Sequence, residues 1–193
     1  MSYLDTLLSR GASAQTSTRY PYFPVGEHIV RIGKCEVNAA AANGAVFVVE
    51  GDIVQSSNPE ARGTHCSVAP LTGSLQKEQI GYGNLKSVTM AVGSSMSADL
   101  DPTDKDWRIT EGTYNPEVLK ELGVLGVVDR DPAKEVRFKG AGLYVKVVGV
   151  QVLKKNQTLP MTKDNSYTKL NWSGLHPDEL VKLGLRAADG SAV

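Results

Sequence analysis

The residues whose types and spacing suggest chemistry are lysines gathered near the C-terminal end of the chain. Between positions 139 and 169 they are opposed by one acidic residue, Asp164, which leaves a local surplus of five positive charges. The whole chain balances 21 basic against 21 acidic residues, so a polyanionic partner must be argued from this cluster and not from net charge. The six lysines are Lys139, Lys146, Lys154, Lys155, Lys163 and Lys169.

Two tyrosines alternate with these lysines. Residues 143–152 and 167–172 have the alternating pattern of strands with one buried face, and Lys154, Lys155 and Lys163 fall in or beside the loop between them. Binding a single nucleic acid strand needs cations along the backbone path and flat rings on which bases stack. The alternative for each lysine is a solvated side chain that keeps an exposed sheet soluble. The outward positions hold Tyr144, Lys146, Tyr167 and Lys169.

Other residues are further candidates for contact with a nucleic acid strand, although some of them fit a place in the core better. Phe47 and Trp172 have apolar neighbours, which favours packing in the core over stacking on bases. Tyr20, Tyr22 and Phe23 lie beside prolines, and the sequence leaves open whether they pack over one end of the fold or form an exposed platform. The additional candidate contacts to nucleic acid are Arg31, Lys34, Arg62 and His65.

The sequence holds no constellation typical of an enzyme or a metal site. The motifs G-x-S-x-G, H-E-x-x-H and the P-loop are absent, and the three histidines are far apart. His65 and Cys66 are the only nucleophile–base pair, and adjacent strand residues point to opposite faces. Cys35 and Cys66 are too few for a disulfide framework and lack the spacing of zinc ligands. We therefore expect no catalysis, no metal and no cofactor.

The elements that position these residues are mainly strands. Three strands come first, then a helical insert over about residues 73–139, then the two strands that carry the tyrosines and lysines. In the first strand Val30 and Ile32 lie on one parity, whereas Cys35 and Val37 lie on the other. A bulge at Gly33 would turn both sets to the interior.

Capping residues predict short helices in the insert and after the last strand. Asn84 begins one helix that Gly93 ends. Residues 115–123 and 176–184 each combine a capping residue, a first-turn proline, a first-turn acid and a final glycine, so they predict two more.

Three strands, a helical insert and two strands, with glycines inside long strands, is the order of an OB-fold. That fold is a five-stranded Greek-key barrel with a helix between strands three and four. Oligonucleotides bind one face of it, framed by the loops that here correspond to residues 38–44 and 154–166. We also expect the closing hairpin to share a sheet with the first strand.

Several patterns together carry a family resemblance. They are the aromatic lead-in YPYFPVGEH, a two-strand meander, a helical insert, and a closing Gly-x-x-Val-x-Val hairpin whose lysine-rich loop leads to aromatic residues. With these patterns, residues 20–172 resemble the bacteriophage single-stranded DNA-binding proteins of the OB-fold type. The chain departs from that family in its aromatic content of 6% and in its C-terminal end AADGSAV, which is not an acidic tail.

The resemblance implies a protein that coats single-stranded DNA without sequence preference in phage-type replication or recombination. Replication or recombination proteins would be its further partners. Two alternatives stay open, a structural or assembly β-barrel protein of a virus and an RNA-binding OB protein. The oligomeric state, monomer or dimer, also stays open.

Domain boundaries and location complete the expectations. We expect a flexible arm at residues 1–19, an OB domain at 20–174, and a short helix with a disordered tail at 175–193. The N-terminus lacks the pattern of a signal peptide, and no apolar stretch is long enough to cross a bilayer. A cytoplasmic protein is therefore expected, in the host cytoplasm if a phage encodes it.

Overall fold

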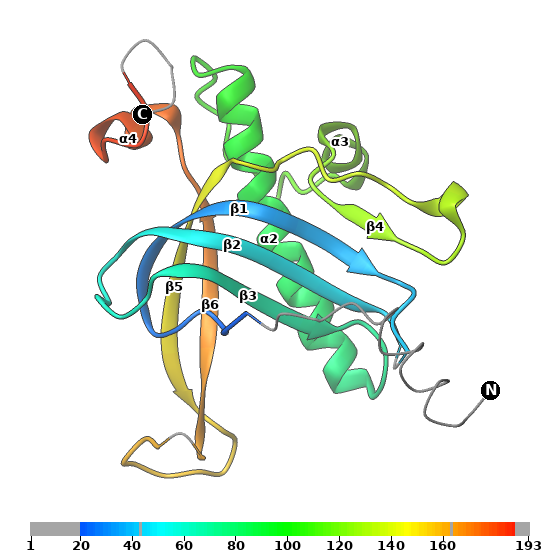
Figure 1. Cartoon of the computed structure of the whole chain (residues 1–193), viewed down its shortest axis with the longest axis vertical. Coiled ribbons are helices and arrows are strands. Elements are labelled where there is room, and N and C mark those ends of the chain that lie inside the picture. Colours follow the sequence, from blue (N-terminus) through cyan, green and yellow to red (C-terminus); the bar gives the residue numbers. More distant parts are fainter. Residues whose placement is uncertain (1–19, 43, 163, 188–193) are drawn as a thin grey trace, which may run out of the picture.

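The computed structural model describes residues 20–42, 44–162 and 164–187, and its main feature is a curled, largely antiparallel sheet. Five strands follow the order β3-β2-β1-β5-β6, and the short β4 (Gly126–Val128) pairs parallel with the end of β1 (Figure 1). The long strands are β1 (Gly26–Asn38), β2 (Val46–Ser56), β3 (Gly63–Pro70), β5 (Tyr144–Leu153) and β6 (Ser166–Gly174).

The mainly β prediction is confirmed, and so is the pairing of the first strand with the closing hairpin through β1 and β5. The predicted closed, five-stranded barrel differs from the structure in two ways. The sheet has a sixth strand, β4, and β3 and β6 do not pair with each other in the part of the chain that is described. The extra strand comes from the apolar run at residues 124–128, for which no strand is predicted above.

The predicted bulge in β1 is present. The register between β1 and β2 shifts between Ile32 and Lys34, at Gly33. Val30, Ile32 and Cys35 are all fully buried, although they lie on different parities in the sequence. The bulge therefore turns one long strand so that both of its halves face the same core.

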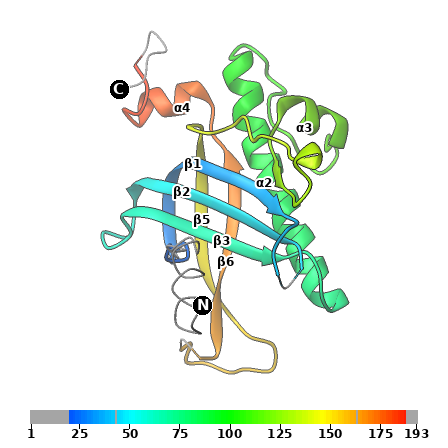
Figure 2. The same cartoon turned by 45° about the vertical axis from the view of Figure 1, so that its right-hand side comes forward.

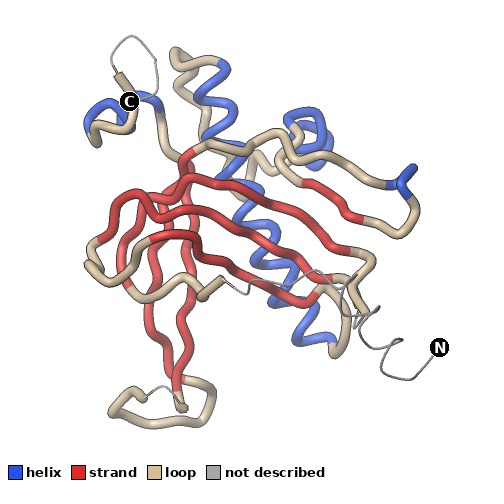
Figure 3. The backbone as a smooth tube through the Cα atoms, viewed as in Figure 1, coloured by secondary structure: helices blue, strands red, loops and turns tan. Residues whose placement is uncertain are grey.

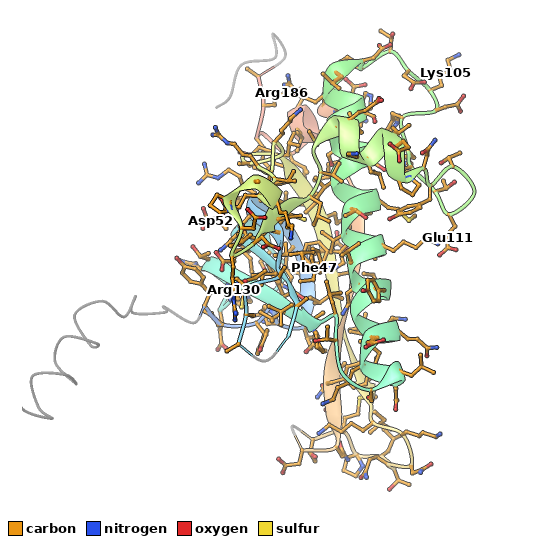
Figure 4. The ribbon with its side chains drawn as sticks, turned by 90° about the vertical axis from the view of Figure 1, so that its right-hand side faces the viewer. Phe47, Asp52, Lys105, Glu111, Arg130 and Arg186 are labelled. Atoms are coloured by element: carbon orange, nitrogen blue, oxygen red, sulfur yellow. The ribbon has the colours of Figure 1, made fainter. Side chains whose placement is uncertain are left out.

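Helix α2 (Leu75–Leu100) packs against the inner side of the sheet. Figures 1 and 2 show β1–β3 crossing in front of β5 and β6, with α2 behind them. Val88 and Val92 of α2 join Phe47 of β2 and Val147 of β5 in one core. In Figure 4, Phe47 points between the sheet and α2. Its predicted place in the core is confirmed.

The helix predicted between Asn84 and Gly93 is much longer than expected, because α2 continues through both positions over 26 residues. Gly81 and Gly93 are contact positions within α2, and Gly93 does not end it. A Cβ atom at Gly81 would lie 1.9 Å from the carbonyl oxygen of Pro70, and one at Gly93 would lie 2.7 Å from the end of the Ile109 side chain. Tertiary packing of this kind stabilises a helix despite unfavourable local propensity.

The two helices predicted from their caps are present as α3 (Pro116–Leu122) and α4 (Pro177–Lys182), and a 3-10 turn, η1 (Pro132–Lys134), follows β4. The side chain of Asn115 accepts a hydrogen bond from the backbone N–H of Glu117, and His176 caps α4 in the same way. Local capping chemistry fixes these helices, so sequence alone suffices to place them.

The segment before β1 occupies the free edge of β3. The N–H of Cys66 donates to the carbonyl of Pro21, and the N–H of Phe23 donates to the carbonyl of Cys66. The Phe23 ring is buried and meets Trp172 of β6 edge to face, with 5.5 Å between ring centroids. Tyr22, in contrast, is 67% exposed. Of the two alternatives left open for these aromatic residues, Phe23 therefore packs in the fold and Tyr22 is exposed. The predicted arm and the end of the predicted tail, residues 188–193, lie outside the described residues.

Candidate nucleic-acid interface

The β5–β6 hairpin extends beyond the rest of the fold, as Figures 1 and 3 show. Residues 154–165 form its tip, the loop between the two strands. Cross-strand pairing sets Val152 opposite Tyr167, Val150 opposite Lys169, and Lys146 opposite Ser173. Directly paired residues share a face of the sheet, so Lys146, Tyr167 and Lys169 line one outer face, as the sequence pattern predicts.

Near the tip this face is exposed and basic. Tyr167 is 50% exposed, and Lys154, Lys155 and Lys169 are exposed as well. The Lys154 ammonium donates to the backbone carbonyl of Asp164 over 2.6 Å, which leaves its charge unneutralised. Lys163, the remaining predicted contact in the loop, lies outside the described residues.

Tyr144 shares the outer face but lies at the opposite end of β5 from the tip. Its ring packs, partly buried, against Ile29, Leu175 and Leu180. These contacts make Tyr144 part of the packing around α4, and the structure therefore separates it from Tyr167 and the loop lysines.

Three of the predicted cations on the sheet are paired with carboxylates. Arg31 lies 3.1 Å from Asp52, and Lys34 lies 3.0 Å from Glu36. Lys146 lies 2.6 Å from Glu27. Exposed pairs of this kind contribute little to stability, but each carboxylate competes with a phosphate for its cation. The part of the hairpin near the tip therefore keeps more unneutralised positive charge than the paired positions on β1 and the start of β5.

Asp52 is the most strongly held of these carboxylates. The Thr64 hydroxyl donates to it over 2.6 Å, and the Arg31 guanidinium donates to its other oxygen over 3.1 Å. The bond from Thr64, followed by that from Arg31, holds the pKa of the Asp52 carboxyl below its usual range. Asp52 therefore stays charged near neutral pH, facing away from α2 in Figure 4.

Of the two remaining predicted contacts, Arg62 lies on the surface and His65 is buried. Arg62 is exposed in the turn before β3. His65 is 6% exposed, because its place in β3 is opposite Gly51 on the inner face. There its ring stacks on Phe23 with 5.9 Å between centroids, and its Nδ1 atom lies 3.1 Å from the Gly63 carbonyl. His65 is thus corrected from a surface cation to a core residue.

Sequence reasoning missed the apolar residues of the tip. Leu159 is 72% exposed and Met161 is 43% exposed. The available signal was the run Leu-Pro-Met inside a lysine-rich loop, where an apolar residue has no strand or helix to pack against. The prediction for this loop rested on its lysines alone and did not consider these apolar residues.

A cavity of about 400 Å³ lies beside Lys146, between β6 and α2. Its lining includes Arg108 as a second cation, together with Trp172, Met90 and Ile109. The lining also includes the carboxylate residue Glu179, and Lys146 is paired with Glu27, so the cavity is of mixed charge.

No family model matches the chain, and no curated protein matches it in sequence. Of the helices within the described ranges, none has the length and apolar character needed to cross a membrane. The function proposed below is therefore based on the geometry and charge of the β5–β6 hairpin.

Proposed function

We propose that this protein binds single-stranded DNA without sequence preference and without catalysis, coating it in phage-type replication or recombination. The observation that carries the proposal is the β5–β6 hairpin, which holds exposed lysines and an exposed tyrosine on one projecting element. Lysines neutralise phosphates whatever the base, and an aromatic ring accepts the face of any base. Such a surface favours a strand of any sequence.

The proposal includes an open OB-type fold. The meander β1-β2-β3, the pairing of β1 with β5, and the helix between β3 and the closing hairpin support it. An OB barrel would also pair its third and fifth strands, which are β3 and β6 here. The segment with Phe23 takes that place, since it bonds to the edge of β3 and contacts β6 through its ring.

A single strand suits this surface better than a duplex. Tyr167 can stack only on a base whose face is free, and a duplex hides its base faces. The paired cations on β1 and β5 add little attraction for the continuous phosphate charge of a duplex, because Asp52, Glu36 and Glu27 lie beside them. Duplex DNA should therefore bind much more weakly.

Titration of a fluorescent oligothymidylate at two salt concentrations tests the proposal. We expect binding that weakens with salt, with a slope of log affinity against log salt of about −0.7 per phosphate contact. A duplex of the same length should compete poorly. No binding, or equal binding to duplex, would reject the proposal, and large protein assemblies formed without DNA would favour a structural protein of a virus. An oligouridylate that binds much more tightly than oligothymidylate would favour RNA as the ligand.

A further inference from the structure

The tip of the β5–β6 hairpin exposes apolar side chains that no part of the proposed function yet uses. Leu159 is 72% exposed and Met161 is 43% exposed, with Pro160 between them. A single exposed leucine is ordinary on a protein surface. Here the three residues are consecutive and lie at the end of the element that projects furthest from the fold (Figures 1 and 3).

The side chain of Asn165 makes three of the hydrogen bonds that hold the tip in shape. The amide nitrogen of Asn165 donates to the carbonyls of Thr158 and Pro160, over 3.2 and 3.0 Å. The amide oxygen of Asn165 accepts from the N–H of Thr162 over 2.7 Å. At the base of the loop, the N–H of Lys154 donates to the carbonyl of Asn165 over 2.8 Å. These bonds fix the backbone on both sides of Leu159, whose side chain is exposed in this conformation.

The charges around the tip indicate which kind of partner binds its exposed apolar side chains. Lys154 and Lys155 are exposed at its base, and Asp164 is the one carboxylate of the loop. A partner that fits must therefore offer apolar surfaces within a polyanion. The bases of a nucleic acid strand, set between phosphates, have that combination, and proteins insert leucine, methionine or proline between bases as apolar wedges.

We infer that Leu159 and Met161 insert between neighbouring bases of the bound strand and unstack them. The inference rests on the proposed function and adds to it a second kind of base contact. Tyr167 extends a stack by adding a ring to it, whereas the tip separates two bases that would otherwise stack on each other. The lysines at the base of the loop would hold the adjacent phosphates while the wedge is in place.

An oligonucleotide with 2-aminopurine between adenines tests this inference, because stacking quenches the fluorescence of 2-aminopurine. Saturating wild-type protein should raise the fluorescence. Leu159→Ser with Met161→Ser should lose most of that rise at concentrations where anisotropy shows the strand to be fully bound. Leu75→Ser is the matched control, since Leu75 is 71% exposed at the start of α2 and should leave the rise unchanged.

Asn165→Ala provides a second variant, which keeps both apolar side chains and removes three of the hydrogen bonds that hold the tip in shape. It should reduce the rise while a urea unfolding midpoint reports the state of the rest of the fold. A wild-type rise in the double serine variant, or full binding by wild type with no rise, would overturn the wedge while leaving strand binding intact. Failure of wild type to bind any strand would instead reject the proposed function. Sedimentation with phosphatidylglycerol vesicles that depends on Leu159 and Met161, without a 2-aminopurine rise, would overturn the wedge in favour of a membrane surface.

Discussion

Asp52 controls how much positive charge Arg31 can offer to a ligand. The two side chains are paired over 3.1 Å on the outer face, and Thr64 fixes the carboxylate from the other side. A phosphate that approaches Arg31 must compete with this carboxylate for the guanidinium charge. The sheet therefore has fewer available cations than a count of its basic residues suggests.

Replacing Asp52 should strengthen binding of single-stranded DNA. Asp52→Asn keeps the shape of the side chain and removes its charge, so Arg31 becomes free to neutralise a phosphate. The slope of log affinity against log salt should steepen by about 0.7 if one contact is gained. Thr64→Val is the control, because it removes a hydrogen bond and leaves the carboxylate in place. Unchanged affinity and slope in the Asn variant would show that the strand does not pass over Arg31.

The same substitution should change how stability depends on pH. Because the pKa of Asp52 is lowered in the folded protein, its contribution is fully present above the unfolded value near 3.8 and is lost as pH falls through the folded value. Asp52→Asn should cost up to about 1 kcal/mol of unfolding free energy at neutral pH, as expected for an exposed pair. Urea unfolding of both proteins should show this difference shrinking below about pH 4. A difference that grows on acidification would contradict the direction of the pKa shift.

At the scale of elements, the hairpin joins charge and stacking in one unit. Lys154→Ala with Lys155→Ala should weaken binding and make the salt slope less negative by up to about 1.4, because each lost phosphate contact removes about 0.7. The fold should survive, since exposed lysines contribute little to stability. Unchanged affinity and slope would show that these lysines serve only as a solvated surface.

Tyr167→Ala is the matched comparison for those lysines. It removes a ring and no charge, so it should cost about 1–3 kcal/mol of binding free energy without changing the salt slope. A changed slope would show that Tyr167 organises the lysines and does not stack on a base.

Helix α2 gives an element-scale test of packing. Gly81 and Gly83 are two positions apart, and a Cβ atom at Gly81 would overlap the carbonyl of Pro70, whereas one at Gly83 would meet nothing within 4 Å. Gly81→Ala should therefore destabilise the protein by about 1–3 kcal/mol through overpacking. Gly83→Ala should stabilise it by about 0.4–1 kcal/mol, because alanine favours the helix and restricts the unfolded chain. Equal urea midpoints for the two variants would refute the contact between α2 and the end of β3.

Across the whole molecule, the sequence predicts what depends on neighbouring residues. Alternation along 143–152, the bulge at Gly33 and the caps at Asn115 and His176 are local patterns, and the structure has all of them. The length of α2 depends on contacts with distant strands. The prediction that Gly93 ends this helix was therefore wrong. His65 is a core residue because its ring stacks on Phe23, which reaches β3 from the segment before β1.

Phe23 tests whether the segment before β1 is part of this whole. Its ring is 2% exposed and contacts His65 of β3 and Trp172 of β6, two strands that do not pair with each other within the described ranges. If that segment completes the core, Phe23→Ala should lower the unfolding free energy by about 3–5 kcal/mol in urea. Tyr22→Ala, one residue away with an exposed ring, should change it by less than about 0.5 kcal/mol. A small effect of the Phe23 substitution would mean that the segment before β1 adds little to the sheet and α2 in holding β3 and β6 together.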